Sequence, residues 1–295
     1  MALPASFLRD GFKPLDTKLR KFRRMMIGTE GESESGKTEF MLSAPGPGII
    51  VCLDRGFEGM LLNPKPPQTR CNDYAFSIVD IPLQSQVKQD GFVEGWNSFK
   101  SIYYKALGNA DALTVGLDTD SASWELQQLA EFGKIAQVPP LMRTGVKAAR
   151  RAMIARAFDS GKNVIGSNML KDEYVDDIGE DGAIKMKDGK SVQKKTGERT
   201  RQGFPDQDYL WQVQLRHLVK KEKVTDGTKT LKMPNGLVVI VGKGLERTVV
   251  TYGIEILKCK FRGDVVGDVL WAEDCCFAGL VQHIFPDVKL KDWGF

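Results

Sequence analysis

Short, continuous runs of apolar residues recur along the first 170 positions, with polar or helical sequence between them. The runs at 48–54, 112–118 and 163–168 each end in a carboxylate or an amide, and such runs are typical of parallel strands buried on both faces. Residues 124–136 and 146–159 place apolar side chains at helical spacing instead. Strands that alternate with helices predict an α/β fold, with a mainly parallel sheet flanked by helices.

The two ends of the chain follow other patterns. Residues 1–22 carry prolines and mixed charge without a period, so we expect an N-terminal arm. Beyond a charged segment at 171–203, four runs are typical of strands with no helix between them: 209–224, 237–241, 248–260 and 265–271. We interpret these runs as an antiparallel C-terminal extension of the same sheet, closed by a helix at 272–284. Residues 23–295 then form one domain, with a charged loop or hairpin inserted at 171–203.

Composition narrows the class of protein. The chain has 295 residues, of which 42% are hydrophobic, enough for a sizeable core. Its 42 Lys and Arg against 38 Asp and Glu give a net charge of +4, too small to favour or exclude a nucleic-acid partner. The longest apolar run, 236–242, is far shorter than the roughly 20 residues of a membrane span. We therefore expect a cytoplasmic protein with no membrane partner.

The cysteine and histidine content argues against two common kinds of site. The five cysteines contain no C-x-x-C pair, and the two histidines, His217 and His283, lie far apart along the chain. A zinc site needs clustered ligands of these types. Two isolated histidines also leave little room for a Ser-His-Asp or Cys-His enzyme. We expect reduced thiols, and chemistry that depends on other groups.

One segment matches the phosphate-loop pattern G-x-x-x-x-G-K-[ST] in full, between the apolar run Met25-Met26-Ile27 and a helical segment. The motif predicts that backbone N–H groups bind the phosphates of ATP, with Lys37 at the β- and γ-phosphates and the Thr38 hydroxyl on Mg²⁺. Two carboxylates in the loop add negative charge, and we expect them to point outward. The predicted nucleotide-binding residues are Gly31, Glu32, Ser33, Glu34, Ser35, Gly36, Lys37 and Thr38.

Asp118 ends the second acidic strand and is followed by Thr119. A carboxylate at this place is typical of a Walker B residue that holds Mg²⁺ through water. An Asp that follows a strand is also often only a helix cap. With a complete phosphate loop upstream, we assign Asp118 a catalytic role beside Lys37 and a metal-binding role beside Thr38.

In their order along the chain, these motifs resemble those of phage-encoded RecA-like ATPases, which carry an "AAA domain" nucleotide-binding label and include the Sak-type single-strand-annealing group. The resemblance rests on the phosphate loop, on Leu53-Asp54, on Leu117-Asp118-Thr119 with Trp124, and on residues 158–165, and it spans residues 25–271. It implies a RecA-like P-loop core, ATP with Mg²⁺, single-stranded DNA as partner, and self-assembly into rings or filaments.

Two further residues receive catalytic roles from this resemblance. Asn168 falls where RecA-like proteins place a polar sensor of the γ-phosphate, although a strand-end Asn can equally satisfy backbone groups. RecA-like enzymes also place a Glu after the second strand to position water. Here the sequence reads Asp54-Arg55-Gly56-Phe57-Glu58, so this carboxylate is either shifted to Glu58 or replaced by Asp54. Glu58 is also consistent with the first turn of a helix.

The insertion at 171–203 falls where the RecA-like fold carries a mobile DNA-binding loop, and its charge is segregated. Residues 171–182 hold one Lys against six acids, and residues 183–203 hold seven Lys or Arg against two acids. The basic half is the predicted contact to the DNA backbone, with a solvated hairpin as the plainer alternative. The predicted DNA-binding residues are Lys185, Lys187, Lys190, Lys194, Lys195, Arg199 and Arg201.

The segment 258–263 places Lys258, Lys260 and Arg262 at alternate positions, which share one face if the segment is a strand. RecA-like ring ATPases carry a similar Lys-x-Arg that reaches a neighbouring subunit's γ-phosphate. The resemblance therefore implies that Lys260 and Arg262 act as a finger in trans. A basic edge strand that discourages aggregation is the alternative.

The leading interpretation is a DNA-dependent ATPase of phage recombination that coats or anneals single strands, with a single-strand-binding protein as a candidate helper. A ring-forming helicase or translocase shares every one of these parts, and directional unwinding of a forked duplex would distinguish it. A nucleotide-gated assembly protein with little turnover is the third alternative, since the water-positioning Glu is displaced. A small-molecule kinase is disfavoured because no Arg-rich lid is visible.

Overall fold

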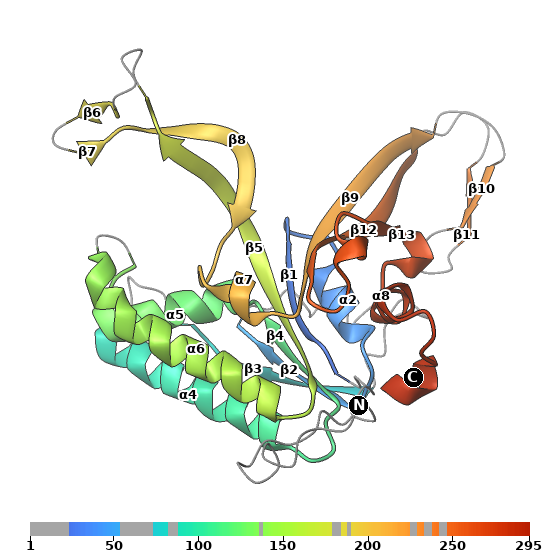
Figure 1. Ribbon diagram of the computed structural model, residues 1–295, viewed down its shortest axis with the longest axis horizontal. Coiled ribbons are helices and arrows are strands. Elements are labelled where there is room, and N and C mark those ends of the chain that lie inside the picture. The colour runs from blue at the N-terminus through green and yellow to red at the C-terminus, as the bar shows by residue number, and fades with distance from the viewer. Residues whose placement is uncertain are drawn as a thin grey trace, which may run out of the picture.

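A mixed sheet of nine strands organises the chain (Figure 1). The computed structural model describes residues 24–53, 73–81, 88–135, 138–178, 184–187, 190–224, 229–232, 238–241 and 247–295. The strands of this sheet are β1 (Met26–Gly31), β2 (Gly48–Cys52), β3 (Tyr74–Ile78), β4 (Thr114–Asp118), β5 (Asn163–Asp176), β8 (Gln193–Arg201), β9 (Val213–Val224), β12 (Arg247–Cys259) and β13 (Val269–Trp271). They lie in the order β13-β12-β9-β1-β5-β4-β2-β3, with β8 paired to β5.

The centre of the sheet is parallel, and its C-terminal strands are antiparallel. β1 lies between β5 and β9 and is parallel to both, while β4 separates β5 from β2. β9, β12 and β13 then pair antiparallel in turn. The predicted α/β class, with a mainly parallel sheet, flanking helices and antiparallel C-terminal strands, is confirmed.

Helices cover both faces of the parallel centre and enclose two hydrophobic cores (Figure 1). The helices are α2 (Lys37–Leu42), α4 (Gln89–Gly108), α5 (Asp120–Phe132), α6 (Arg143–Asp159), α7 (Gln207–Leu210) and α8 (Phe277–Ile284). One core packs α2 and α8 against β1, β9 and β12. The other packs α4, α5 and α6 against the opposite face. Burial on both faces explains why the central strands are continuous apolar runs.

Several predicted elements need correction. α4 and the edge strand β3 are not among the predicted elements at all. The predicted strand at 237–241 does not extend the main sheet, because β11 (Val238–Val241) pairs with β10 (Lys229–Lys232) in a separate two-stranded sheet. The closing helix begins at Phe277, because residues 272–274 form a 3₁₀ turn, and only residues 269–271 of the predicted 265–271 strand join the sheet.

The insertion at 171–203 is built as a long β-hairpin. β5 continues past the body of the sheet to Asp176, and β8 returns antiparallel beside it (Figure 1). A short pair, β6 (Met186–Lys187) and β7 (Lys190–Ser191), lies beyond its far end. Every residue of β8 from Gln193 to Arg199 is exposed. This part of the hairpin therefore has no buried face from which an apolar alternation could arise.

A buried ion pair holds the helical layer to the base of this hairpin. Arg150 of α6 and Asp120 of α5 are paired, with side chains 0% and 1% exposed. Asp120 also accepts a hydrogen bond from Gln207 of α7, the short helix that follows β8. Removing one partner of such a pair would leave a buried charge uncompensated. The cluster therefore links α5, α6 and α7 as one unit.

Candidate functional site

The phosphate loop connects the carboxyl end of β1 to the first residue of α2, as the motif predicts. Two of its glycines are required by geometry. Gly36 has φ = 90°, in the left-handed region that disfavours other residues. A Cβ added at Gly31 would lie 2.5 Å from Ser35 Oγ and 2.9 Å from His217 Cβ, so no side chain fits there.

Lys37 points back into the loop. Its Nζ donates to the carbonyl oxygens of Gly31 at 3.0 Å and Glu32 at 2.5 Å, and it lies 3.5 Å from Ser35 Oγ. These three acceptors are backbone and hydroxyl oxygens and carry no formal charge. A phosphate oxygen is a stronger acceptor for an ammonium group than such neutral oxygens are. The position of Lys37 therefore suits an anion held at the mouth of the loop.

Thr38 and Asp118 meet at the carboxyl edge of the sheet. Thr38 Oγ1 donates to Asp118 Oδ2 at 2.7 Å, although the two residues are 80 positions apart. Ser167 of β5 donates its hydroxyl to Asp118 Oδ1 at 2.6 Å. Asp118 is only 3% exposed, so the two hydroxyls hold its carboxylate in one orientation.

This arrangement fits a magnesium ion brought with phosphates. Mg²⁺ prefers oxygen ligands, keeps several waters, and is commonly held by one or two carboxylates together with substrate phosphates. Thr38 and Asp118 offer one hydroxyl and one carboxylate within hydrogen-bond distance of each other. In the part of the chain that the structure describes, no group of three or more His, Cys, Asp or Glu could hold a metal ion.

Asn168 lies on β5 between the two halves of this site. Its backbone pairs with Glu30 at the end of β1, and its side chain is wholly buried. The amide Nδ2 donates to the Thr29 carbonyl at 3.3 Å, and Oδ1 accepts from Ser121 Oγ at 3.4 Å. These contacts correspond to the alternative in which the amide satisfies strand-end groups, and the sensor role stays a prediction.

The acidic residues of the loop point outward, as expected, and one of them has a partner. Glu32, Ser33 and Glu34 are all exposed. The Glu32 carboxylate lies 3.3 Å from the guanidinium of Arg199 on β8. The hairpin therefore touches the phosphate loop through an ion pair.

The segregated charge of the insertion is explained by pairing across the hairpin. Lys185 lies 2.8 Å from Asp177, and Lys195 lies 2.8 Å from Asp172. The hydrogen bond from Lys195 lowers the pKa of the Asp172 carboxyl. The acidic half of the insertion thus neutralises part of the basic half, which opposite charges on neighbouring strands favour.

The other predicted DNA-binding residues have different surroundings. Arg201 is at the foot of the hairpin, 2.7 Å from Asp208 of α7, with its side chain 13% exposed. Lys194 makes no ion pair with any residue that the structure describes, and its side chain is exposed. The side chains of Lys187 and Lys190 lie outside the described part of the chain, as do Glu58, Asp54 and the N-terminal arm.

The predicted finger residues lie far from the phosphate loop of their own chain. β12 ends at Cys259, whose partner Val213 lies beside Ile27 at the amino end of β1. Lys260 then donates to the Tyr209 carbonyl at 2.7 Å. Arg262 points elsewhere, pairing with Asp264 and donating to the His283 carbonyl at 3.2 Å. Because β12 ends at Cys259, the alternation of side chains along a strand does not continue to Arg262. Lys260 and Arg262 therefore contact different parts of the protein.

His217, to which the sequence pattern assigns no role, lies directly beneath the phosphate loop. It is 4% exposed, and its ring packs edge-on against Phe40 of α2 with centroids 5.6 Å apart. Burial, followed by the nearby Lys37 charge, lowers the pKa of His217 to about 3. Neither ring nitrogen has a hydrogen-bond partner of ordinary geometry among the described residues. A lone histidine on a strand carries no sequence signal for this position.

Tyr252 of β12 also borders the loop without any signal in the sequence. A Cβ added at Gly36 would lie 3.4 Å from its Cδ1. Burial raises the pKa of the Tyr252 hydroxyl, and the charges of Glu39 and Glu34 act in the same direction. An aromatic ring therefore flanks the loop on the side of α2.

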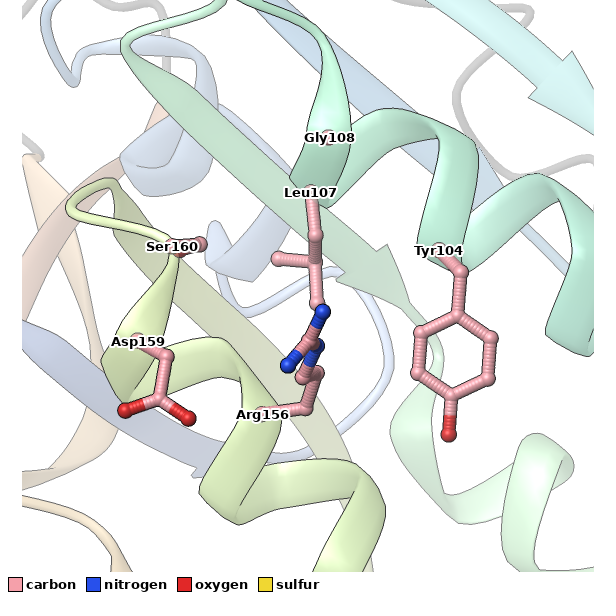
Figure 2. A pocket seen from close by; sticks show the side chains of 6 residues that line it. All are labelled: Tyr104, Leu107, Gly108, Arg156, Asp159 and Ser160. Atoms are coloured by element: carbon pink, nitrogen blue, oxygen red, sulfur yellow. The ribbon is translucent and has the colours of Figure 1, made fainter.

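A separate hollow of about 400 Å³ lies between the carboxyl ends of α4 and α6 (Figure 2). Figure 2 shows the Arg156 side chain extending toward Leu107, with Asp159 on one side of it and Tyr104 on the other. Because β4 and β5 begin just after these helices, the hollow lies at the amino edge of the sheet, opposite the phosphate loop. It contributes no residue to the candidate site.

No protein-family model matches the chain, and no curated protein sequence is significantly similar to it. None of the helices in the described residues is long and apolar enough to cross a membrane.

Proposed function

We propose that this protein is a RecA-like P-loop ATPase that binds ATP with Mg²⁺ and acts on single-stranded DNA in phage recombination or annealing. The observation that carries the proposal is the 2.7 Å hydrogen bond between Thr38 and Asp118. A phosphate-loop hydroxyl and a strand-end carboxylate that meet in this way are the two groups that hold Mg²⁺ in P-loop NTPases.

The topology supports the same proposal. β5 lies between the strand that leads into the phosphate loop and the strand that ends in Asp118. Asn168 on β5 is therefore between them at the carboxyl edge, the place that the RecA-like resemblance gives to a polar sensor. Ligands of open α/β sheets bind outside the carboxyl ends of the strands.

Each side chain of the site has a role in binding a nucleoside triphosphate. Lys37 exchanges its loop carbonyls for phosphate oxygens, which a charged donor binds more strongly than neutral acceptors. Thr38 and Asp118 hold Mg²⁺, and the bound ion offsets phosphate charge. Ser167 keeps the Asp118 carboxylate oriented.

The DNA contact and the assembly into rings or filaments rest on the resemblance and on two structural features. The hairpin of β5 and β8 projects from the sheet and carries exposed cations such as Lys194. Lys260 and Arg262 lie at the far edge from their own phosphate loop, so they can approach such a loop only in another copy of the chain.

The test is ATP hydrolysis by the purified protein with and without single-stranded DNA, together with a binding measurement. Lys37→Ala is expected to weaken MgATP binding at least about tenfold, the effect of one charge-assisted hydrogen bond. Lys134→Ala, which removes an exposed lysine elsewhere, should bind as the wild type does.

The outcomes separate a DNA-dependent ATPase from a nucleotide-gated assembly protein, while unwinding of a forked duplex would separate a helicase from an annealing protein. Turnover that DNA stimulates and that Lys37→Ala abolishes supports the recombination-type ATPase. Tight ATP binding without turnover favours a nucleotide-gated assembly protein instead. A wild-type protein that binds no MgATP at all would refute the proposal.

A further inference from the structure

Arg199 has an unusual position for a hairpin residue. It lies on β8, yet its Nη2 is 3.3 Å from Glu32 of the phosphate loop and donates to the Leu170 carbonyl at 3.1 Å. Its Nε is 3.5 Å from Asp172 on the neighbouring strand. One guanidinium therefore joins both strands of the hairpin to the phosphate loop.

The partner of Arg199 on the loop is an unusual residue as well. Glu32 lies within the G-x-x-x-x-G-K-[ST] motif, where its carboxylate opposes the binding of an anion. Its backbone carbonyl is at the same time an acceptor for Lys37 Nζ. The Glu32 carboxylate is thus one of two counterions of Arg199, beside Asp172, and it lies in a loop whose ligand would itself be strongly negative.

The pair is well placed to be exchanged. The Arg199 and Glu32 side chains are 42% and 52% exposed, and exposed ion pairs contribute little and rearrange easily. A guanidinium binds phosphate in a planar, two-bonded geometry, which makes phosphate a stronger partner than one carboxylate at 3.3 Å.

We propose that Arg199 is a second cation of the phosphate site, paired with Glu32 until the terminal phosphate of a nucleoside triphosphate replaces that carboxylate. The inference rests on the proposed function, since it requires that the loop binds a triphosphate. It also removes Arg199 from the set of DNA contacts and makes it a phosphate-binding residue supplied by the same chain.

The experiment compares the binding of MgATP and MgADP by calorimetry. Arg199→Ala should weaken MgATP binding about 10- to 100-fold, as expected for a charge-assisted hydrogen bond, and MgADP binding less than about threefold. Arg199→Lys, which keeps the charge but not the fork, should recover part of the loss. Arg151→Ala is the matched control, because it removes another exposed, ion-paired arginine, on α6.

A double-mutant cycle tests the exchange itself. Glu32→Gln should tighten MgATP binding about 3- to 10-fold, because it leaves Arg199 paired with Asp172 alone and removes a repulsive charge from the loop. In a protein that already carries Arg199→Ala, Glu32→Gln relieves only the repulsion between the loop and the phosphates. Its gain in MgATP affinity should therefore be at least about twofold smaller than in the wild type. Glu198→Gln, the same charge change at the residue of β8 that precedes Arg199, should have no effect on MgATP binding.

The failures are distinguishable. If the wild type binds MgATP and Lys37→Ala does not, the proposed function stands, and Arg199→Ala decides the inference. If Arg199→Ala binds MgATP as the wild type does, the inference about Arg199 is overturned. It is also overturned if Arg199→Ala loses affinity for MgATP and MgADP equally. A loss of single-stranded DNA binding with MgATP binding unchanged would return Arg199 to the DNA contacts. A wild type that binds neither nucleotide refutes both.

Discussion

Two charged regions of the molecule differ in how deeply their ion pairs are buried. The Asp120–Arg150 pair is almost completely buried and joins three helices. The pairs that hairpin residues make, Lys195 with Asp172 and Arg199 with Glu32 of the phosphate loop, have side chains 32–54% exposed. A buried pair cannot exchange partners without leaving an uncompensated charge, whereas an exposed pair can. The buried pair is therefore suited to stabilising the fold. The exposed pairs are suited to changing partners when an anion binds.

The largest expected effect comes from breaking the buried Asp120–Arg150 pair. Arg150→Met leaves Asp120 buried without its counterion and should destabilise the protein by about 3–5 kcal/mol, measured by urea unfolding. Adding Asp120→Asn removes the second charge and should recover at least half of the loss, because a neutral amide is far less costly to bury. If the free energy of unfolding of Arg150→Met alone lies within about 1 kcal/mol of the wild-type value, the buried pair does not stabilise the fold as expected.

The next effect concerns His217, a buried base that stays neutral. Its pKa is about 3 in the folded protein, so acidification below the ordinary value near 6.5 protonates only the unfolded chain. The contribution of neutral His217 to the free energy of unfolding is complete above the ordinary pKa of histidine. This contribution is lost as the pH falls from that value toward the pKa of about 3 in the folded protein. Between pH 6.5 and 4.5 this group should lower the free energy of unfolding by about 2 kcal/mol.

The measurement for His217 is urea unfolding across that pH range. His217→Leu should have a shallower pH dependence than wild type by that amount. His283→Gln is the control, since His283 is partly exposed and paired with Asp268 at 2.8 Å, and it should retain the wild-type loss. Parallel pH curves for His217→Leu and wild type would contradict the buried, neutral state.

The smallest effect belongs to the exposed hairpin. Lys195→Ala should raise the pKa of Asp172 toward its ordinary value, because the Lys195 hydrogen bond is the main cause of its lowering. The unfolding midpoint should hardly move, in contrast to Arg150→Met. Carboxyl pKa values measured by NMR give the test, with Lys194→Ala as the control on the same strand. An Asp172 pKa that does not change would show that the pair is not formed in solution.

The elements with a strong local pattern are those that the sequence predicts well. β2, β4 and β5 are buried on both faces, so each begins as a continuous apolar run. β3 lies at the edge of the sheet and has mixed burial, but residues 74–80 also form a mostly apolar run that ends in a carboxylate, so the same pattern could have predicted this strand. α4 contains Gly91, Gly95 and Gly108, and glycine weakens a helical pattern.

The strands of the hairpin lack a local signal for a related reason. Residues 193–199 have no buried face, so apolar and polar positions do not alternate there. These strands are held by backbone pairing and by charges that come from opposite halves of the insertion. Counting charges along the chain reveals two blocks of opposite sign, but pairing between them depends on the turn that brings the halves together.

The phosphate loop and the acidic strand end could be read from local sequence, because a loop that binds phosphate needs glycines, a lysine and a hydroxyl at set intervals. Their partners could not be read in this way. The Thr38–Asp118 bond, the position of His217 beneath the loop and the contact between Arg199 and Glu32 join residues 80 or more positions apart. Such contacts arise from the order in which strands pair, which is a property of long-range packing and not of any single segment.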